Sequence, residues 1–213
     1  MEILALISVR IIDWLINLDK YLFVLINSVF TNKTLDSIYP WWREGNTWAP
    51  LYVFIITFMF LNFGKRTWPW LAFVLLNILL SDQVSSTLFK NYFMRLRPCA
   101  DPMLQYQVRL LLDHCSGGYS FTSSHATNHF GFVLFLIQTL KPFINKFRWP
   151  LFLWAGSIAY GQVYVGVHYP LDVICGALLG CMLGYILASI YNRRIAKYFP
   201  LVLNNEIIDN NTA

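Results

Sequence analysis

A histidine and an aspartate stand four positions apart in the stretch GQVYVGVHYPLD, residues 161–172, in an apolar part of the chain. Pro170 is well suited to be the first residue of a helix, which would make Asp172 the third helical residue. From that position its carboxylate can reach back to His168. A carboxylate that holds one ring nitrogen fixes the tautomer and leaves the other nitrogen free to attack or to accept a proton. The alternative is a buried polar pair whose two side chains only hydrogen-bond to each other.

Two further histidines lie in the stretch YSFTSSHATNHFG. Ser123 or Ser124 is a natural N-cap for the helix that follows, and the free N–H groups at a helix N-terminus attract anions. His125 would lie at that end and could donate a proton. With His129, one turn further on, it could instead bind a metal ion. No Asp or Glu close in sequence completes a ligand set, which favours a packing role for His129.

Two cations lie in the stretch KNYFMRLRP. Lys90 and Arg97 are seven residues apart, a spacing that predicts one common side of a helix, and Pro98 discourages that helix from continuing. Two positive charges at one place suit an anionic group. The alternative is a pair of basic side chains that reach toward lipid headgroups.

Together these clusters supply a nucleophile with its orienting carboxylate, a proton donor, two cations and a helix N-terminus. Phosphoryl transfer through a phosphohistidine needs this set, with no metal and no cofactor. A non-catalytic protein that binds or flips lipid phosphates is the rival from another class. It would explain Lys90 and Arg97 but has no need for His168 paired with Asp172.

The composition predicts an all-α, polytopic membrane helical bundle. Of 213 residues, 57% are hydrophobic and 13% charged, far from the average soluble domain. A nucleic-acid partner is not expected, because the sequence shows no clustered basic patch. Five apolar stretches are long enough, with their polar ends, to be expected as transmembrane helices. They are residues 48–63, 68–89, 126–144, 149–167 and 170–191.

The N-terminal stretch, residues 3–30, is apolar but contains four charged residues, so it could span the bilayer or lie in its interface. We expect an N-terminal membrane-associated segment over residues 1–47, the helical bundle over 48–192, and a tail over 193–213 that is first basic and then polar. The charged residues of the N-terminal stretch are Arg10, Asp13, Asp19 and Lys20.

The basic residues between the apolar stretches predict the orientation, because cytoplasmic loops are rich in lysine and arginine. Loops 90–125 and 167–170 are then extracytoplasmic, which puts all three polar clusters on the outer face. The basic residues that predict cytoplasmic loops are Lys65, Arg66, Lys141, Lys146, Arg148, Arg193, Arg194 and Lys197.

The pattern Lys-x6-Arg-Pro, then Ser-Ser-His, then Tyr-x-Gly-x-His-x3-Asp resembles the type-2 phosphatidic acid phosphatase and vanadium haloperoxidase superfamily over about residues 45–192. The membrane branch of that family consists of helical lipid phosphatases. The resemblance implies a metal-independent phosphohistidine mechanism with His168 as nucleophile, Asp172 as its partner and His125 as the acid. It also implies a phosphate cradle of Lys90, Arg97, Ser123 and the backbone near Ser124.

Two positions depart from the family pattern: Thr122 stands where proline is usual, and Gln162 where arginine is usual. Gln162 keeps a hydrogen bond donor to the phosphate but removes a positive charge. Arg95 and Arg109 could supply the missing charge. We expect Arg109 to do so, because a loop residue can fold over the site while Arg95 lies off the predicted Lys90 helix face.

The substrate expected from the sequence is undecaprenyl diphosphate, because the small size, the compact outer loop and the SDQVSS stretch resemble bacterial members that act on it. Phosphatidic acid, phosphatidylglycerol phosphate and lipid A phosphates stay open, as does the oligomeric state. A vanadate-dependent haloperoxidase is the enzymatic rival, but the family's haloperoxidases are soluble. We expect a multi-pass protein of a bacterial inner membrane with its site facing the periplasm or exterior.

Four cysteines complete the chemical groups of interest. Cys99 and Cys115 fall in the predicted outer loop, where an oxidising compartment would let them pair. Cys175 and Cys181 lie in the last apolar stretch and are expected to act as small apolar residues. His114 adjoins Cys115, but the two lack further ligands for a metal site.

Overall fold

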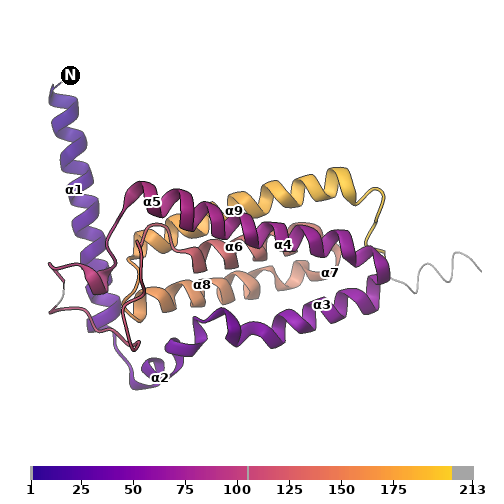
Figure 1. Ribbon diagram of the computed structural model, residues 1–213, viewed down its shortest axis with the longest axis horizontal. Coiled ribbons are helices and arrows are strands. Elements are labelled where there is room, and N and C mark those ends of the chain that lie inside the picture. The colour runs from indigo at the N-terminus through magenta and orange to yellow at the C-terminus, as the bar shows by residue number, and fades with distance from the viewer. Residues whose placement is uncertain (1, 105, 203–213) are drawn as a thin grey trace, which may run out of the picture.

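A computed structural model describes residues 2–104 and 106–202, and this part of the chain is helical without strands. Five helices run side by side along the long axis of the molecule (Figure 1). They are α3 (Ala49–Phe63), α4 (Thr67–Gln83), α6 (Ser124–Thr139), α8 (Arg148–Tyr164) and α9 (Pro170–Ile190). Each coincides within a few residues with one expected apolar stretch, so the all-α prediction is confirmed.

Shorter segments connect these helices and extend them. They are η1 (Leu25–Val29), α2 (Lys33–Trp42), η2 (Gly45–Trp48), η3 (Gly64–Arg66), η4 (Val84–Phe89), α5 (Lys90–Phe93), η5 (Pro98–Ala100), α7 (Lys141–Ile144), η6 (Asn145–Phe147) and η7 (Tyr191–Ile195). Most of the predicted polar tail, residues 203–213, lies outside the described residues.

Two stretches of the described residues are long and apolar enough to cross a membrane, Gly45–Ala100 and Pro170–Ile195. The first contains α3 and α4, which are joined by a tight turn. Large apolar side chains point outward from the bundle, such as Leu153 with 73% and Leu178 with 67% of its surface exposed. Such outward-facing apolar surface suits lipid contact. The count of five spans stays a prediction.

Glycine allows α6 and α9 to approach closely. Gly176, Gly180 and Gly184 repeat every four residues along α9. A Cβ atom at Gly180 would collide with the carbonyl oxygen of Thr127, and one at Gly184 with that of Gly131. Small residues in this spacing permit backbone contact between membrane helices. The packing brings the N-terminal ends of α6 and α9 together, where the predicted chemical groups lie.

The loops sort to two ends of the bundle as the charge pattern predicts. The α3–α4 turn, the α6–α8 connection and the end of α9 lie at one end (Figure 1). The segment after α5 and the α8–α9 turn lie at the other end, next to α1 (Glu2–Val24). The predicted basic loops are therefore on one side and the three motifs on the other.

Helix α1 crosses the motif-bearing end of the bundle at a steep angle to the five parallel helices (Figure 1). Two charged groups fix α1 to the bundle: Lys20 pairs with Asp101 at 2.8 Å, and Asp19 accepts a hydrogen bond of 2.8 Å from the backbone N–H of Leu171. The predicted boundary between residues 47 and 48 falls inside η2.

Candidate active site

His168 is buried in the turn between α8 and α9. Its Nε2 lies 3.1 Å from a guanidinium nitrogen of Arg97. Because arginine can only donate, Nε2 is the acceptor and the ring proton belongs on Nδ1. Nδ1 faces Asp172 Oδ2 at 3.5 Å, longer than an ordinary hydrogen bond. This tautomer places the lone pair on Nε2, and it can attack phosphorus once a phosphate takes over the Arg97 hydrogen bond.

The charge state of His168 suits the same role. Burial lowers the pKa of His168 below its ordinary value, and the opposing effect of Asp172 does not offset it. The positive charges of Arg97 and Lys90 act in the same direction as burial. The imidazole is therefore neutral near pH 7, as a nucleophile must be.

Asp172 lies in the first turn of α9, which begins at Pro170 as predicted. Its Oδ2 accepts a hydrogen bond of 2.9 Å from the backbone N–H of Tyr169, which closes a capping box at the helix start. Its Oδ1 accepts a hydrogen bond of 2.7 Å from Arg95. The carboxylate that faces His168 is thus held from two further directions.

Arg95 links Asp172 to the N-terminal helix. Its other terminal nitrogen pairs with Asp19 Oδ2 at 2.6 Å, and its guanidinium lies 3.9 Å from the centre of the Tyr169 ring. The result is a row of alternating charges from Asp19 through Arg95 to Asp172, the residue that faces His168. From the sequence, Arg95 is expected only as a possible replacement for the missing charge at position 162. The sequence does hold one signal for this contact: Asp19 lies inside an apolar stretch, where a carboxylate needs a cationic partner.

The prediction that Lys90 and Arg97 share one helix face is wrong. Helix α5 ends at Phe93, and Met94 adopts a left-handed conformation with φ 46°. Arg97 then lies in extended backbone and donates to the carbonyl oxygens of Val167 at 3.1 Å and Gly117 at 3.3 Å. Lys90 nevertheless lies within electrostatic range of Arg97. The tertiary fold, rather than helix periodicity, brings the two cations together.

A disulfide joins Cys99 to Cys115, with the two Cα atoms 5.8 Å apart, as the sequence hypothesis proposed. It closes the loop of residues 99–115 just before Gly117, whose carbonyl oxygen accepts from Arg97. Cys175 and Cys181 are free thiols in α9 and are partly buried. The disulfide therefore ties the loop that contacts Arg97.

Helix α6 begins at Ser124 with Ser123 as its N-cap, as predicted. The Ser123 hydroxyl oxygen accepts from the N–H of Ala126 at 3.4 Å, and the Ser123 N–H donates to the carbonyl oxygen of Asp172 at 3.0 Å. Ser124 accepts a hydrogen bond of 3.0 Å from the Ser85 hydroxyl. Ser123 thus fixes the two helix N-termini to one another, through its N–H group and through its hydroxyl oxygen as an acceptor.

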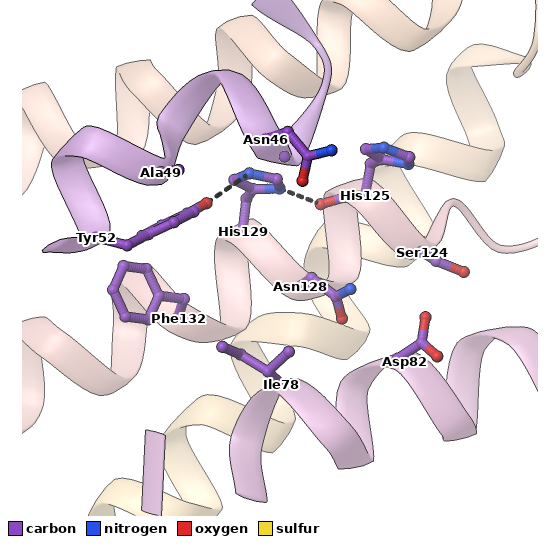
Figure 2. Close-up of a pocket in the computed structure, with 11 residues that line it drawn as sticks. Asn46, Ala49, Tyr52, Ile78, Asp82, Ser124, His125, Asn128, His129 and Phe132 are labelled. Carbon is purple, nitrogen blue, oxygen red and sulfur yellow. Dashed lines mark hydrogen bonds between the residues drawn. The ribbon is translucent and has the colours of Figure 1, made fainter. Parts of the chain in front are cut away.

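A cavity of about 380 Å³ adjoins His125. Polar side chains lie at the end nearest His125, and apolar ones lie at the opposite end (Figure 2). The polar ones are Asn46, Asp82, Ser124 and Asn128, and the apolar ones are Ala49, Tyr52, Ile78 and Phe132. A group bonded to a phosphate near His125 can occupy this space.

His129 has a protein partner at both ring nitrogens (Figure 2). Its Nδ1 donates to the carbonyl oxygen of His125 at 2.8 Å, and its Nε2 lies 3.2 Å from the Tyr52 hydroxyl. These contacts support a packing role for His129 rather than a shared metal site with His125.

The structure does not bring Arg109 to Gln162. Arg109 pairs with Asp36 at 2.7 Å and donates to the carbonyl oxygen of Asn27 at 3.1 Å. The cation beside Gln162 is instead Arg43, whose Nε donates to Gln162 Oε1 at 3.1 Å. Arg43 follows α2, far from the motifs in sequence, and sequence reasoning missed it because nothing local relates it to them.

Known proteins resemble this chain in sequence and in fold. The model of the PAP2 superfamily matches residues 70–196. The lipid A 4'-phosphatase of Porphyromonas gingivalis is 30% identical over 184 residues, covering 84% of this chain and 75% of the relative. The crystal structure of Aquifex aeolicus LpxE has a TM-score of 0.61 at 29% identity, covering 81% of this chain and 95% of that one. A transmembrane PAP2-type phosphatidylglycerolphosphate phosphatase from Bacillus subtilis gives 0.62 at 25% identity, covering 84% and 87%.

Proposed function

The chain belongs to the PAP2 superfamily and is a lipid phosphatase, and from this premise we propose that it hydrolyses a sugar-linked lipid phosphate monoester. The reaction uses a phosphohistidine and needs no metal. The site faces the periplasm or exterior of a bacterial inner membrane. Lipid A phosphates are the class of substrate that fits this proposal.

In the proposed mechanism, His168 Nε2 attacks phosphorus, forming the N–P bond while the bond to the leaving oxygen breaks. His125 must be protonated at this step, and the phosphate dianion offsets the burial and the neighbouring cations that lower its pKa. His125 then gives its proton to that oxygen, so the product leaves as an alcohol. Water, deprotonated by His125, then attacks phosphorus and releases inorganic phosphate and neutral His168. Lys90, Arg97 and the backbone near Ser124 stabilise the charge on the non-bridging oxygens.

The position of Asp82 in the cavity is the observation that favours one substrate over the others. It lines the cavity beside His125, together with the amides of Asn46 and Asn128. The Asn128 Oδ1 atom is buried and has no hydrogen bond partner among the residues that the structure describes. Carboxylate and amide groups suit the hydroxyl and amide groups of a sugar, whereas the phosphate leaving group of a diphosphate would meet the charge of Asp82. This favours a lipid A phosphate over undecaprenyl diphosphate, the substrate expected from the sequence.

The membrane arrangement belongs to the same proposal. Helices α3, α4, α6, α8 and α9 would span the bilayer, and α1 would lie in the outer interface within the N-terminal segment 1–47. The bundle would occupy residues 48–192, and the tail 193–213 would begin in the cytoplasm.

Phosphate release from a lipid panel tests the proposal. Purified protein with chelator and no added metal is given lipid A, undecaprenyl diphosphate, phosphatidylglycerol phosphate and phosphatidic acid. We expect the highest kcat/KM with lipid A, and Asp82→Asn should narrow its advantage over the diphosphate. His168→Ala should abolish release, since the nucleophile is lost. A preference for undecaprenyl diphosphate that Asp82→Asn leaves unchanged would contradict the substrate, and turnover by His168→Ala would contradict the mechanism.

A further inference from the structure

We infer that Arg43 binds the phosphate in this chain as a catalytic residue and that Gln162 positions it. The inference rests on the proposed phosphatase reaction at His168, but not on the identity of the lipid. It assigns a role to a residue that lies outside the three motifs and outside the segment matched by the family model.

Arg43 is held against α8 by two contacts with Gln162. Its Nε donates to Gln162 Oε1 at 3.1 Å, and its carbonyl oxygen accepts from Gln162 Nε2 at 3.5 Å. The Arg43 side chain is only 7% exposed. A long, charged side chain that is buried and clamped in this way is pre-organised.

Gln162 connects Arg43 to the turn that carries the nucleophile. Its backbone carbonyl oxygen accepts from the N–H groups of both Val167 and His168 at 3.2 Å. Arg43 is also within electrostatic range of His125 and Arg97. The guanidinium therefore lies among the groups that surround the reacting phosphate.

The charge balance of this region favours an anion. The carboxylate paired with Arg43 belongs to Glu44, at 2.6 Å, and the Glu44 side chain is 48% exposed. A carboxylate in such contact with solvent is screened and compensates a buried cation weakly. Lys90 and Arg97 add two more positive charges. A phosphate dianion would supply the missing negative charge, and a guanidinium can bind two of its oxygens at once.

This arrangement gives a physical reason for glutamine at position 162. The amide oxygen accepts the Arg43 N–H, which a second guanidinium cannot do. An arginine at 162 would place two like charges within hydrogen bond distance in a buried site. Gln162→Arg alone should therefore lower activity, although it adds the charge that the family pattern has at this position.

The experiment compares Arg43→Met with Arg109→Met, a second outer-face arginine that is paired with a carboxylate, and with Arg193→Met, an exposed arginine at the opposite end. Two quantities are measured: kcat/KM for an activated aryl phosphate, and the inhibition constant of inorganic phosphate. We expect Arg43→Met to lower kcat/KM by about 100-fold, as the loss of one pre-organised charge-stabilising donor does, and to weaken phosphate inhibition. Arg193→Met should match the parent.

The charge swap keeps the test decisive if Arg43→Met folds poorly. Arg43→Gln combined with Gln162→Arg restores both the cation and its acceptor, with the two side chains exchanged. We expect it to recover activity relative to either single variant. Parent-like phosphate inhibition in well-folded Arg43→Met, or a loss that appears in Arg109→Met instead, overturns the inference, and so does a folded charge-swap variant without recovery. Aryl phosphate turnover without lipid A turnover would refute only the proposed substrate.

Discussion

Replacing Arg95 by methionine tests the charge network that holds Asp172. The substitution keeps most of the aliphatic volume and removes the guanidinium between Asp19 and Asp172, which lie 2.6 and 2.7 Å from its nitrogens. Both carboxylates are buried. The variant therefore leaves two buried anions without their shared cation.

The loss of stability depends on the hydrogen bonds that each carboxylate keeps in the variant. Removing one partner of a buried ion pair costs about 3–5 kcal/mol. Asp172 keeps the N–H of Tyr169 and Asp19 keeps that of Leu171, and the Arg95 side chain is 20% exposed. We therefore expect the lower end, about 3 kcal/mol. For a chain of this size that corresponds to a fall of about 6–12 °C in the unfolding midpoint.

Thermal unfolding of the purified proteins in detergent measures this fall, with Arg193→Met as the control at an exposed arginine. Asp19→Asn is added to both the parent and Arg95→Met. It should destabilise the parent, where the carboxylate is paired, and be neutral or stabilising in Arg95→Met, where it removes an unpaired charge. An unfolding midpoint of Arg95→Met within about 2 °C of the parent, or the same effect of Asp19→Asn in both backgrounds, would refute the reasoning.

Three other predictions concern the chemistry and the orientation. His125→Ala should lower kcat/KM more for a lipid monophosphate than for an activated aryl phosphate, whose leaving group needs no proton; equal losses would argue against an acid role. The pKa of His168 is lower than the ordinary histidine pKa of 6.5, so the imidazole stays neutral at pH 6.5 and above. The acidic limb of the kcat/KM profile should therefore lie below pH 6.5, and a limb above pH 7 that Asp172→Asn shifts would contradict this. A cysteine label beside Arg109 should react from outside the cell and one beside Lys146 should not; the reverse result would place the site in the cytoplasm.

The helices and their caps could be predicted because their signals are local. Apolar runs set the five long helices, Pro170 marks the start of α9, and Ser123 caps α6. The pairing of Cys99 with Cys115 was also within reach, since both fall in one outer loop. These features depend on residues close together in the chain.

The predictions that were wrong or missing share one cause: tertiary contacts leave no local signal in the sequence. Met94 adopts a left-handed conformation without being glycine, so the end of α5 was not visible and the helix was expected to reach Arg97. Arg109 was chosen for its place in a loop, but Asp36 of α2 holds it. Arg43 lies 119 positions from Gln162, and no periodicity relates them.

Helix α1, which crosses the end of the bundle, affects which part of the chain must be transferred to keep the site intact. The segment that matches the family model begins at residue 70 and holds every motif residue. Asp19 and Arg43 both lie before it, and each contacts a charged or polar group of the site. A chimera that joined residues 70–196 to the N-terminal helices of a relative would keep His168 and Asp172, yet it would leave Arg95 and Gln162 facing foreign side chains. The smallest unit that can be transplanted whole therefore begins in α1, upstream of the segment by which the family is recognised.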